Sequence, residues 1–281
     1  MKLGAFKSLR TALKTSGDVG GFLVEQLDDY IKDASGADTY IPSRTFHPSG
    51  MICPRVIYYQ LKGVKPTDSQ PSESMTRIGE SGSDAHVRIQ QWLTMMGESQ
   101  TFKAKWMYCD VAQYIREHDL KDLDVVRKNG MEYLIYDKRY DMRFQTDGIL
   151  YNRELKRYFV FEFKTESQMK WDRRTWVDEK HYNQGIAYSL AFGIDNVIFV
   201  YEGRDFLQHK GYCFHVNDAM REDLVRLMDL VKICVKRDIL PPCLCKKYHI
   251  DKYSSYRSLC LNDRKGEVSD ERQDKPHVDY A

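Results

Sequence analysis

One strongly hydrophobic run dominates the pattern of apolar and polar positions along the chain. Residues 158–164 are aromatic or β-branched except for Glu162 and Lys164, which predicts a buried strand. Residues 142–151 predict a second strand, and the polar segment 152–156 between the two has the length of a hairpin loop. The two strands are therefore expected to be antiparallel neighbours.

Further periodic stretches extend this picture in both directions. Helical spacing is found at residues 87–96 and 218–237, and short buried strands are predicted at 196–201 and 211–216. The helix that precedes residue 196 is expected to end near Gly193. Residues 1–32 suggest two short amphipathic helices with residues 17–21 between them, and residues 65–74 suggest a loop. This order predicts an α/β fold with a mixed central sheet flanked by helices.

Composition narrows the class of protein without naming a function. The 281 residues are 42% hydrophobic and 30% charged, which suits one sizeable core with appendages. We expect no membrane span and no signal peptide, hence a cytoplasmic protein. Seven cysteines then favour reduced thiols or a metal site over disulfides.

The charge balance gives only local hints of a polyanionic partner. A net charge of +2 is not the footprint of a typical nucleic-acid binder. Basic side chains gather at Lys170, Arg173 and Arg174, and again over residues 232–247. Such clusters are usually solvated surface, and they gain meaning only beside a carboxylate metal site, where phosphate contacts would be needed.

The candidate chemistry lies at the ends of the first two predicted strands. Side chains alternate along a strand, so Glu162 and Lys164 share one face, and Asp147 is expected across the pair from Glu162. Buried charges of this kind are costly unless they pair or hold a metal. Two carboxylates and a lysine suit Mg²⁺ or Mn²⁺; the alternative is a structural ion pair at a sheet end.

The order Asp147, then Glu162-Phe163-Lys164, resembles the D…ExK signature of the PD-(D/E)xK nuclease superfamily. Three other stretches resemble its RecB-like branch. Residues 77–86 are similar to the G…H segment, Gln184 and Tyr188 match QxxxY on one helix face, and residues 46–59 resemble the Ser…CPR…YY segment of CRISPR-associated RecB-like and AddB-type exonucleases. Without the resemblance, His86 would be an ordinary helix or core histidine, and Gln184 and Tyr188 polar residues at a helix–sheet seam.

The resemblance implies a restriction-endonuclease-like core and a DNA nuclease that depends on Mg²⁺ or Mn²⁺. It implies metal ligation by His86, Asp147, Glu162 and the main-chain carbonyl of Phe163, with Lys164 acting on the attacking water. Gln184 and Tyr188 would contact DNA or steady the centre.

The preferred hypothesis is an exonuclease that acts on DNA ends or single strands. It would serve recombination, repair, or phage or CRISPR DNA processing, with protein partners from those systems, and a phage enzyme would work in its host's cytoplasm. The alternatives are an endonuclease on the same fold and a non-catalytic subunit that binds DNA ends or assembles a complex.

The cysteines suggest a second centre. Cys53 far upstream and Cys243, Cys245 and Cys260 near the end are distributed as in the iron–sulfur nucleases of the RecB-like branch, which implies a [4Fe–4S] cluster. The spacing departs from that family, because one residue rather than two separates Cys243 from Cys245. The alternatives are zinc, held by the last three cysteines with His249, or ordinary reduced thiols.

We accordingly expect four parts in the chain. Residues 1–45 form an N-terminal helical cap, residues 46–240 the nuclease core, residues 241–263 a cysteine-containing segment that packs back on the core, and residues 264–281 a disordered tail.

Overall fold

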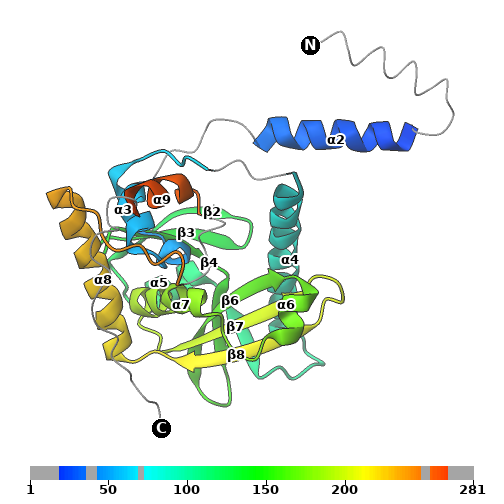
Figure 1. Cartoon of the computed structure of the whole chain (residues 1–281). Coiled ribbons are helices and arrows are strands. Elements are labelled where there is room, and N and C mark those ends of the chain that lie inside the picture. Colours follow the sequence, from blue (N-terminus) through cyan, green and yellow to red (C-terminus); the bar gives the residue numbers. More distant parts are fainter. Residues whose placement is uncertain (1–18, 36–42, 69–72, 248–253, 265–281) are drawn as a thin grey trace. The chain divides into compact units, whose positions relative to one another are not determined.

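A computed structural model describes residues 19–35, 43–68, 73–247 and 254–264 (Figure 1). The chain divides into two compact units, Met1–Tyr40 with Gln70–Asp84 and Ile41–Ser69 with Ala85–Ala281. No helix in the described ranges is long and apolar enough to cross a membrane.

The first unit contains helix α2 (Val19–Ser35) and the first part of α4 (Glu73–Glu98). Asp28 of α2 forms an ion pair with Arg77 of α4. The two helices predicted with a break at residues 17–21 are partly wrong, because α2 runs through Gly20; the first of them lies outside the described residues. The segment 77–86, expected to lead into a helix, is itself helical.

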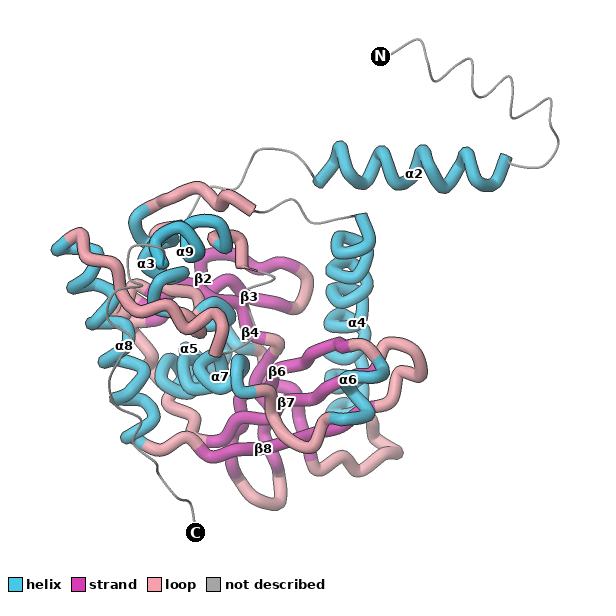
Figure 2. Tube along the Cα trace, viewed as in Figure 1, coloured by secondary structure: helices cyan, strands magenta, loops and turns pink. Residues whose placement is uncertain are grey.

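The second unit is built around a five-stranded sheet in the order β1-β5-β6-β7-β8, of which Figure 2 labels β6, β7 and β8. Strands β6 and β7 pair in parallel, whereas the other neighbours are antiparallel. This is the mixed sheet that the sequence predicts. Its strands are β1 (Trp106–Cys109), β5 (Gly148–Asn152), β6 (Arg157–Glu166), β7 (Asn196–Gly203) and β8 (His209–His215).

A smaller antiparallel sheet joins β2 (Leu123–Asn129), β3 (Glu132–Asp137) and β4 (Met142–Thr146) in that order. The single strand predicted over residues 142–151 is therefore wrong in one respect: it is two strands, β4 and β5, in two different sheets. The predicted hairpin between β5 and β6 is confirmed by their antiparallel register. Asp147 lies where the chain crosses from one sheet to the other.

Helices cover both faces of the larger sheet. On one face Phe159, Phe161 and Phe163 of β6 pack against Ala85 and Ile89 of α4. On the other face α7 (Glu179–Phe192) lies on β6 and β7, and α8 (Asp218–Arg237) packs on α7 and on α3 (Pro54–Lys62). The short elements are η1 (Pro48–Gly50), α5 (Val111–Glu117), α6 (Gln168–Arg173) and α9 (Arg257–Arg264).

The ends of the two long helices of this core follow from local chemistry. Asp178 caps the start of α7 by accepting the Lys180 amide, and Asn217 caps α8 by accepting the Met220 amide. Gly193 ends α7 as predicted, with a φ of 68° that glycine adopts without strain. These caps define the extent of α7, which lies over β6, where the candidate charges are.

Candidate functional site

Asp147 is fixed in position by the backbone around it. Its Oδ2 accepts the amide N–H of Phe163 at 2.6 Å. Its main-chain carbonyl accepts the side chains of Gln90, at 2.9 Å, and Tyr108, at 2.8 Å. The next residue, Gly148, has a φ of 154°, and a Cβ there would lie 2.4 Å from the Tyr108 ring. Only glycine fits this crossing point, which therefore determines where the Asp147 carboxylate lies.

Glu162 and Lys164 share a face of β6, as their spacing predicts. Lys164 donates from Nζ to Glu162 Oε1 at 2.6 Å, and the Gln184 amide donates to the same oxygen at 2.6 Å. The other oxygen, Oε2, is buried and has no hydrogen-bond partner in the described part of the chain. Burial and the nearby charge of Asp147 raise the pKa of Glu162 to about 7.

His86 comes to Asp147 from helix α4. Its Nδ1 lies 2.7 Å from Asp147 Oδ1, and its ring stands edge-on to Phe163 at 5.3 Å between ring centres. Burial lowers the pKa of His86, but the hydrogen bond to Asp147 and the carboxylate charges raise it overall. The sequence-predicted pair Asp147 and His86 is thus in direct contact.

Glu132 is an additional acidic residue at this point that the sequence analysis did not single out. It begins β3, and its carboxylate lies 3.9 Å from His86 Nδ1. One ligand atom each from His86, Glu132 and Asp147 fall within 4.8 Å of one another. Burial, with the charge of Asp147, raises the pKa of Glu132. No spacing rule would have found it, because it belongs to the other sheet.

Gln184 and Tyr188 lie one turn apart on α7 and are both buried. Besides Glu162, the Gln184 amide donates to the Tyr188 hydroxyl at 2.8 Å. That hydroxyl donates in turn to the main-chain carbonyl of Gln145 at 2.7 Å. The pair therefore links the Glu162 carboxylate to strand β4, which leads directly into Asp147.

The donor set suits a hard divalent cation. Asp147 and Glu132 supply carboxylate oxygens and His86 a nitrogen within 4.8 Å of one another. Glu162, which lies outside that group, adds an Oε2 that has no hydrogen-bond partner in the described part of the chain. Buried carboxylate oxygens are normally hydrogen-bonded, so a partnerless one marks a place where a cation would compensate the charge. Oxygen-rich sets of this kind prefer Mg²⁺ or Mn²⁺. For Phe163 the structure gives an amide that binds Asp147, and ligation by its carbonyl stays a prediction.

Three of the four predicted cysteines form a second cluster. The sulfur atoms of Cys53, Cys243 and Cys245 lie within 4.8 Å of one another. Cys260, on α9, is buried beside them and hydrogen-bonds with Cys245, which raises the pKa of Cys245 to about 12. His249, the fourth ligand of the zinc alternative, lies outside the described residues.

The C-terminal segment is tied to α3 around these thiols. The Leu244 amide donates to the sulfur of Cys53 at 3.2 Å, and the Arg55 side chain donates to the Pro241 carbonyl at 2.8 Å. Tyr256 stacks on Tyr59 at 5.4 Å between ring centres. Residues almost 200 positions apart thus meet at the cysteine cluster.

Residues that contact Glu162 and residues of the cysteine region line one cavity of about 480 Å³. Lys164 and Gln184 line it from the carboxylate side, and Cys53 and Tyr256 line it from the cysteine side. Lys180 and His181 of α7 complete this wall. A ligand in the cavity would therefore touch residues from both candidate centres.

Comparison with known proteins adds a distant likeness. No protein-family model and no curated protein matches the sequence. Among solved structures, SSO0001 matches with a TM-score of 0.46 and 15% identity over 86% of this chain and 98% of its own. An alkaline exonuclease from Laribacter hongkongensis, LHK-Exo, matches at 0.38 and 11% over 86% and 100%, and its complex with dAMP at 0.40 and 13% over 82% and 98%. Similarity at this level does not indicate a function. The function is inferred from the residues of the site.

Proposed function

We propose that this chain is a metal-dependent nuclease of the PD-(D/E)xK superfamily, RecB-like branch, that hydrolyses phosphodiester bonds in DNA. One observation carries the proposal. Asp147 and the Glu162–Lys164 ion pair lie at the same end of the paired strands β5 and β6; His86 contacts Asp147, and Glu162 has a buried oxygen with no hydrogen-bond partner among the described residues.

The residues divide the work of hydrolysis between them. Asp147, Glu162, His86 and Glu132 would hold Mg²⁺ or Mn²⁺, which when bound supplies Lewis-acid stabilisation of the phosphate and a more acidic water. Lys164, whose charge is offset by Glu162, orients the attacking water and stabilises charge developing on the phosphate oxygens. Gln184 and Tyr188 keep the Glu162 carboxylate in place through their hydrogen bonds.

An exonuclease that acts on ends or single strands is the preferred form of this activity. An endonuclease on the same fold is the first alternative. A non-catalytic subunit that binds DNA ends or assembles a complex is the second, and the cost of retaining buried charges without a use counts against it. Lys164 is only 24% exposed and Glu162 4%, so this cost applies to both.

The decisive experiment is digestion of linear and covalently closed DNA, single- and double-stranded, with Mg²⁺ or Mn²⁺. Lys164→Ala should reduce the rate by at least about a hundredfold, because it removes the cation that pairs with Glu162. Lys121→Ala, at a position 79% exposed, is the matched control and should cut normally. Cleavage by Lys164→Ala at the wild-type rate would reject the proposed centre, and cutting of closed circles would identify an endonuclease.

We propose a [4Fe–4S] cluster for the second centre, held by Cys53, Cys243, Cys245 and Cys260. Four thiolates are its usual complement, and the proximity of these four buried or half-buried sulfurs supports it. Protein purified without oxygen should be brown and contain iron, and Cys243→Ala should lose both colour and iron. Cys213→Ala, an exposed cysteine outside the cluster, should keep them. Zinc with no iron on elemental analysis would favour the zinc alternative.

A further inference from the structure

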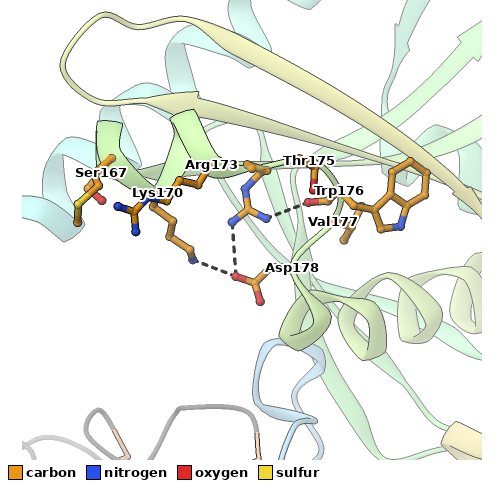
Figure 3. A pocket seen from close by; sticks show the side chains of 9 residues that line it. Ser167, Lys170, Arg173, Thr175, Trp176, Val177 and Asp178 are labelled. Carbon is orange, nitrogen blue, oxygen red and sulfur yellow. Dashed lines mark hydrogen bonds and ion pairs between the residues drawn. The ribbon is translucent and has the colours of Figure 1, made fainter.

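A second cavity, which the proposed chemistry leaves unused, is formed by the segment that follows β6. It measures about 600 Å³ and is lined by residues 167, 169, 170 and 173–178 (Figure 3). Three basic side chains, Lys170, Arg173 and Arg174, line it against one carboxylate, that of Asp178. Lys170 pairs with Asp178 at 2.9 Å and Arg174 with Glu166 at 2.5 Å, which leaves the charge of Arg173 uncompensated among the described residues and suits an anionic ligand.

The two most available groups in this cavity are a cation and an aromatic ring. Arg173 is exposed, and its guanidinium has no ion pair or hydrogen bond with any side chain of the described ranges. Trp176 is 48% exposed. Its indole N–H donates to the Tyr182 hydroxyl, and its ring stands edge-on to Tyr212 at 5.7 Å between centres. The indole is thus held in one orientation with much of its surface open.

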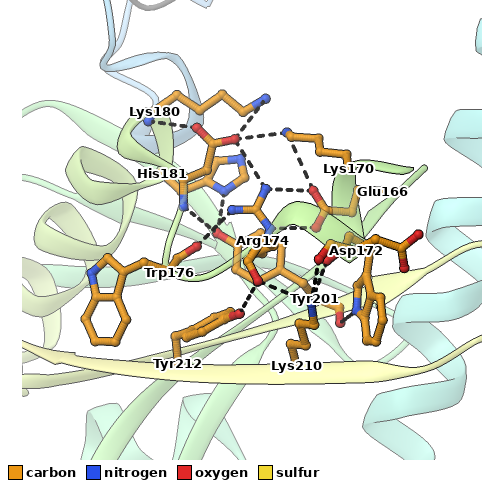
Figure 4. Close-up of polar contacts among 12 residues, drawn as sticks. Glu166, Lys170, Asp172, Arg174, Trp176, Lys180, His181, Tyr201, Lys210 and Tyr212 are labelled. Carbon is orange, nitrogen blue, oxygen red and sulfur yellow. Dashed lines mark hydrogen bonds and ion pairs between the residues drawn. The ribbon is translucent and has the colours of Figure 1, made fainter. Parts of the chain in front are cut away.

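The segment is anchored rather than loose, and Arg174 is its anchor (Figure 4). The Arg174 side chain is 6% exposed and forms two hydrogen bonds with the Glu166 carboxylate, at 2.5 and 2.7 Å. It also donates to the Trp176 carbonyl at 3.0 Å, and its guanidinium lies over the Tyr201 ring at 3.9 Å. The sequence analysis grouped Arg174 with surface cations; the structure corrects this, because Arg174 is buried and holds the segment that presents Arg173 and Trp176.

This cavity adjoins the candidate active site. Ser167 comes three residues after Lys164, a separation of about 10 Å along an extended strand. Lys180, which lines the cavity of the active site, lies 3.9 Å from Asp178, which lines the second cavity. The contact between Lys180 and Asp178 therefore separates the two cavities.

We infer that the 167–178 cavity binds single-stranded DNA next to the bond to be cut. Trp176 stacks on an unpaired base, and Arg173, with Lys170 beside it, contacts backbone phosphates. Aromatic stacking combined with backbone cations is the usual means of holding single strands, and it needs bases that are not already stacked in a duplex. A pre-positioned indole makes such binding less costly in entropy. This inference rests on the proposed function for its position beside the cut, but its test does not require cleavage.

The test measures binding of a fluorescein-labelled thymidine oligonucleotide by anisotropy, in EDTA so that no metal-dependent cutting occurs. Trp176→Ala should raise Kd at least about fivefold, the effect of losing one stacked base, whereas Trp176→Phe should retain most of the affinity. Trp92→Ala, at a position 51% exposed on α4, is the matched control and should bind normally. Arg173→Gln should reduce the slope of log Kd against log salt by about 0.7.

Two results would overturn the inference: an unchanged Kd for Trp176→Ala, or an equal loss of affinity with a blunt duplex. If Trp176→Ala fails to fold by circular dichroism, Trp176→Phe and the exposed Arg173→Gln still decide. The two proposals also fail separately. If Trp176→Ala weakens binding but the wild type does not cleave DNA, only the proposed nuclease activity is rejected. If the wild type cleaves DNA and Trp176→Ala binds normally, only the proposed role of the cavity is rejected.

Discussion

At the scale of single residues, the candidate centre is surrounded by titratable groups whose charge states are set by burial. His181 is the clearest case outside the proposed ligands. Its ring is stacked on Phe199 and Tyr201, and its Nδ1 shares a hydrogen bond with the Tyr201 hydroxyl at 2.9 Å. Burial, with the positive charge of Lys164 next, lowers the pKa of His181 to about 2. The folded protein therefore keeps His181 neutral where the unfolded chain would bind a proton.

The sign of the resulting pH dependence follows from that difference. Below the ordinary histidine pKa of about 6.5 the unfolded state binds one more proton at this position, so stability falls as the pH drops below it. His181→Phe, which keeps a ring in the stack, should unfold at a temperature that falls less between pH 7 and pH 5 than that of the wild type. Thermal unfolding followed by circular dichroism measures this.

The exposed His215 provides the control for that measurement. It lies outside the ring stack around His181, so His215→Phe should show the same acid sensitivity as the wild type. Equal acid sensitivity in all three proteins would show that His181 is not the group responsible.

At the scale of elements, the crossing from β4 to β5 determines the position of Asp147. Gly148→Ala would force an alanine to a φ of 154° and bring its Cβ within 2.4 Å of the Tyr108 ring. We expect a loss of about 1 to 3 kcal/mol in the free energy of unfolding, and displacement of the neighbouring Asp147 should lower metal affinity as well. Urea denaturation and Mn²⁺ titration calorimetry measure the two effects.

Gly193→Ala separates backbone strain from crowding. Gly193 also has a positive φ, of 68°, but a Cβ there would meet nothing within 4 Å. The Gly193→Ala variant should lose only about 1 kcal/mol in the free energy of unfolding and should bind Mn²⁺ normally. If Gly193→Ala impaired metal binding as much as Gly148→Ala, the crossing point would have no special role.

The sequence predicted those elements whose hydrophobic pattern lies within one continuous segment. Strand β6 and helix α8 follow directly from an apolar run and from helical spacing, and the bounds of α8 agree with the predicted range. The split between β4 and β5 could not be predicted from the sequence. The alternation of buried and exposed residues in β4 runs up to Asp147, and no turn residues separate the two strands before it. Glu132 was hidden for a related reason: only the tertiary arrangement of the two sheets brings it to His86.

At the scale of the whole second unit, the chain closes on itself around one cavity. Helix α3 near its start and the segment around Cys245 near its end meet at the cysteine cluster, through contacts that span more than 180 positions. The same meeting point forms one wall of the cavity that contains Lys164 and Gln184. Folding of the two ends is therefore coupled to the shape of the candidate active site.

This shared wall links the proposed nuclease activity to the oxidation of the cysteines. Thiols and iron–sulfur clusters react with oxygen, and Cys53 belongs both to the cluster and to the lining of the cavity. Damage to the proposed cluster would free Cys53 to move and would loosen the wall of the cavity that Cys53 lines. The proposed nuclease activity per milligram of protein would then fall with time spent in air, although none of the proposed metal ligands had changed. Preparations that differ only in their exposure to air would differ in rate.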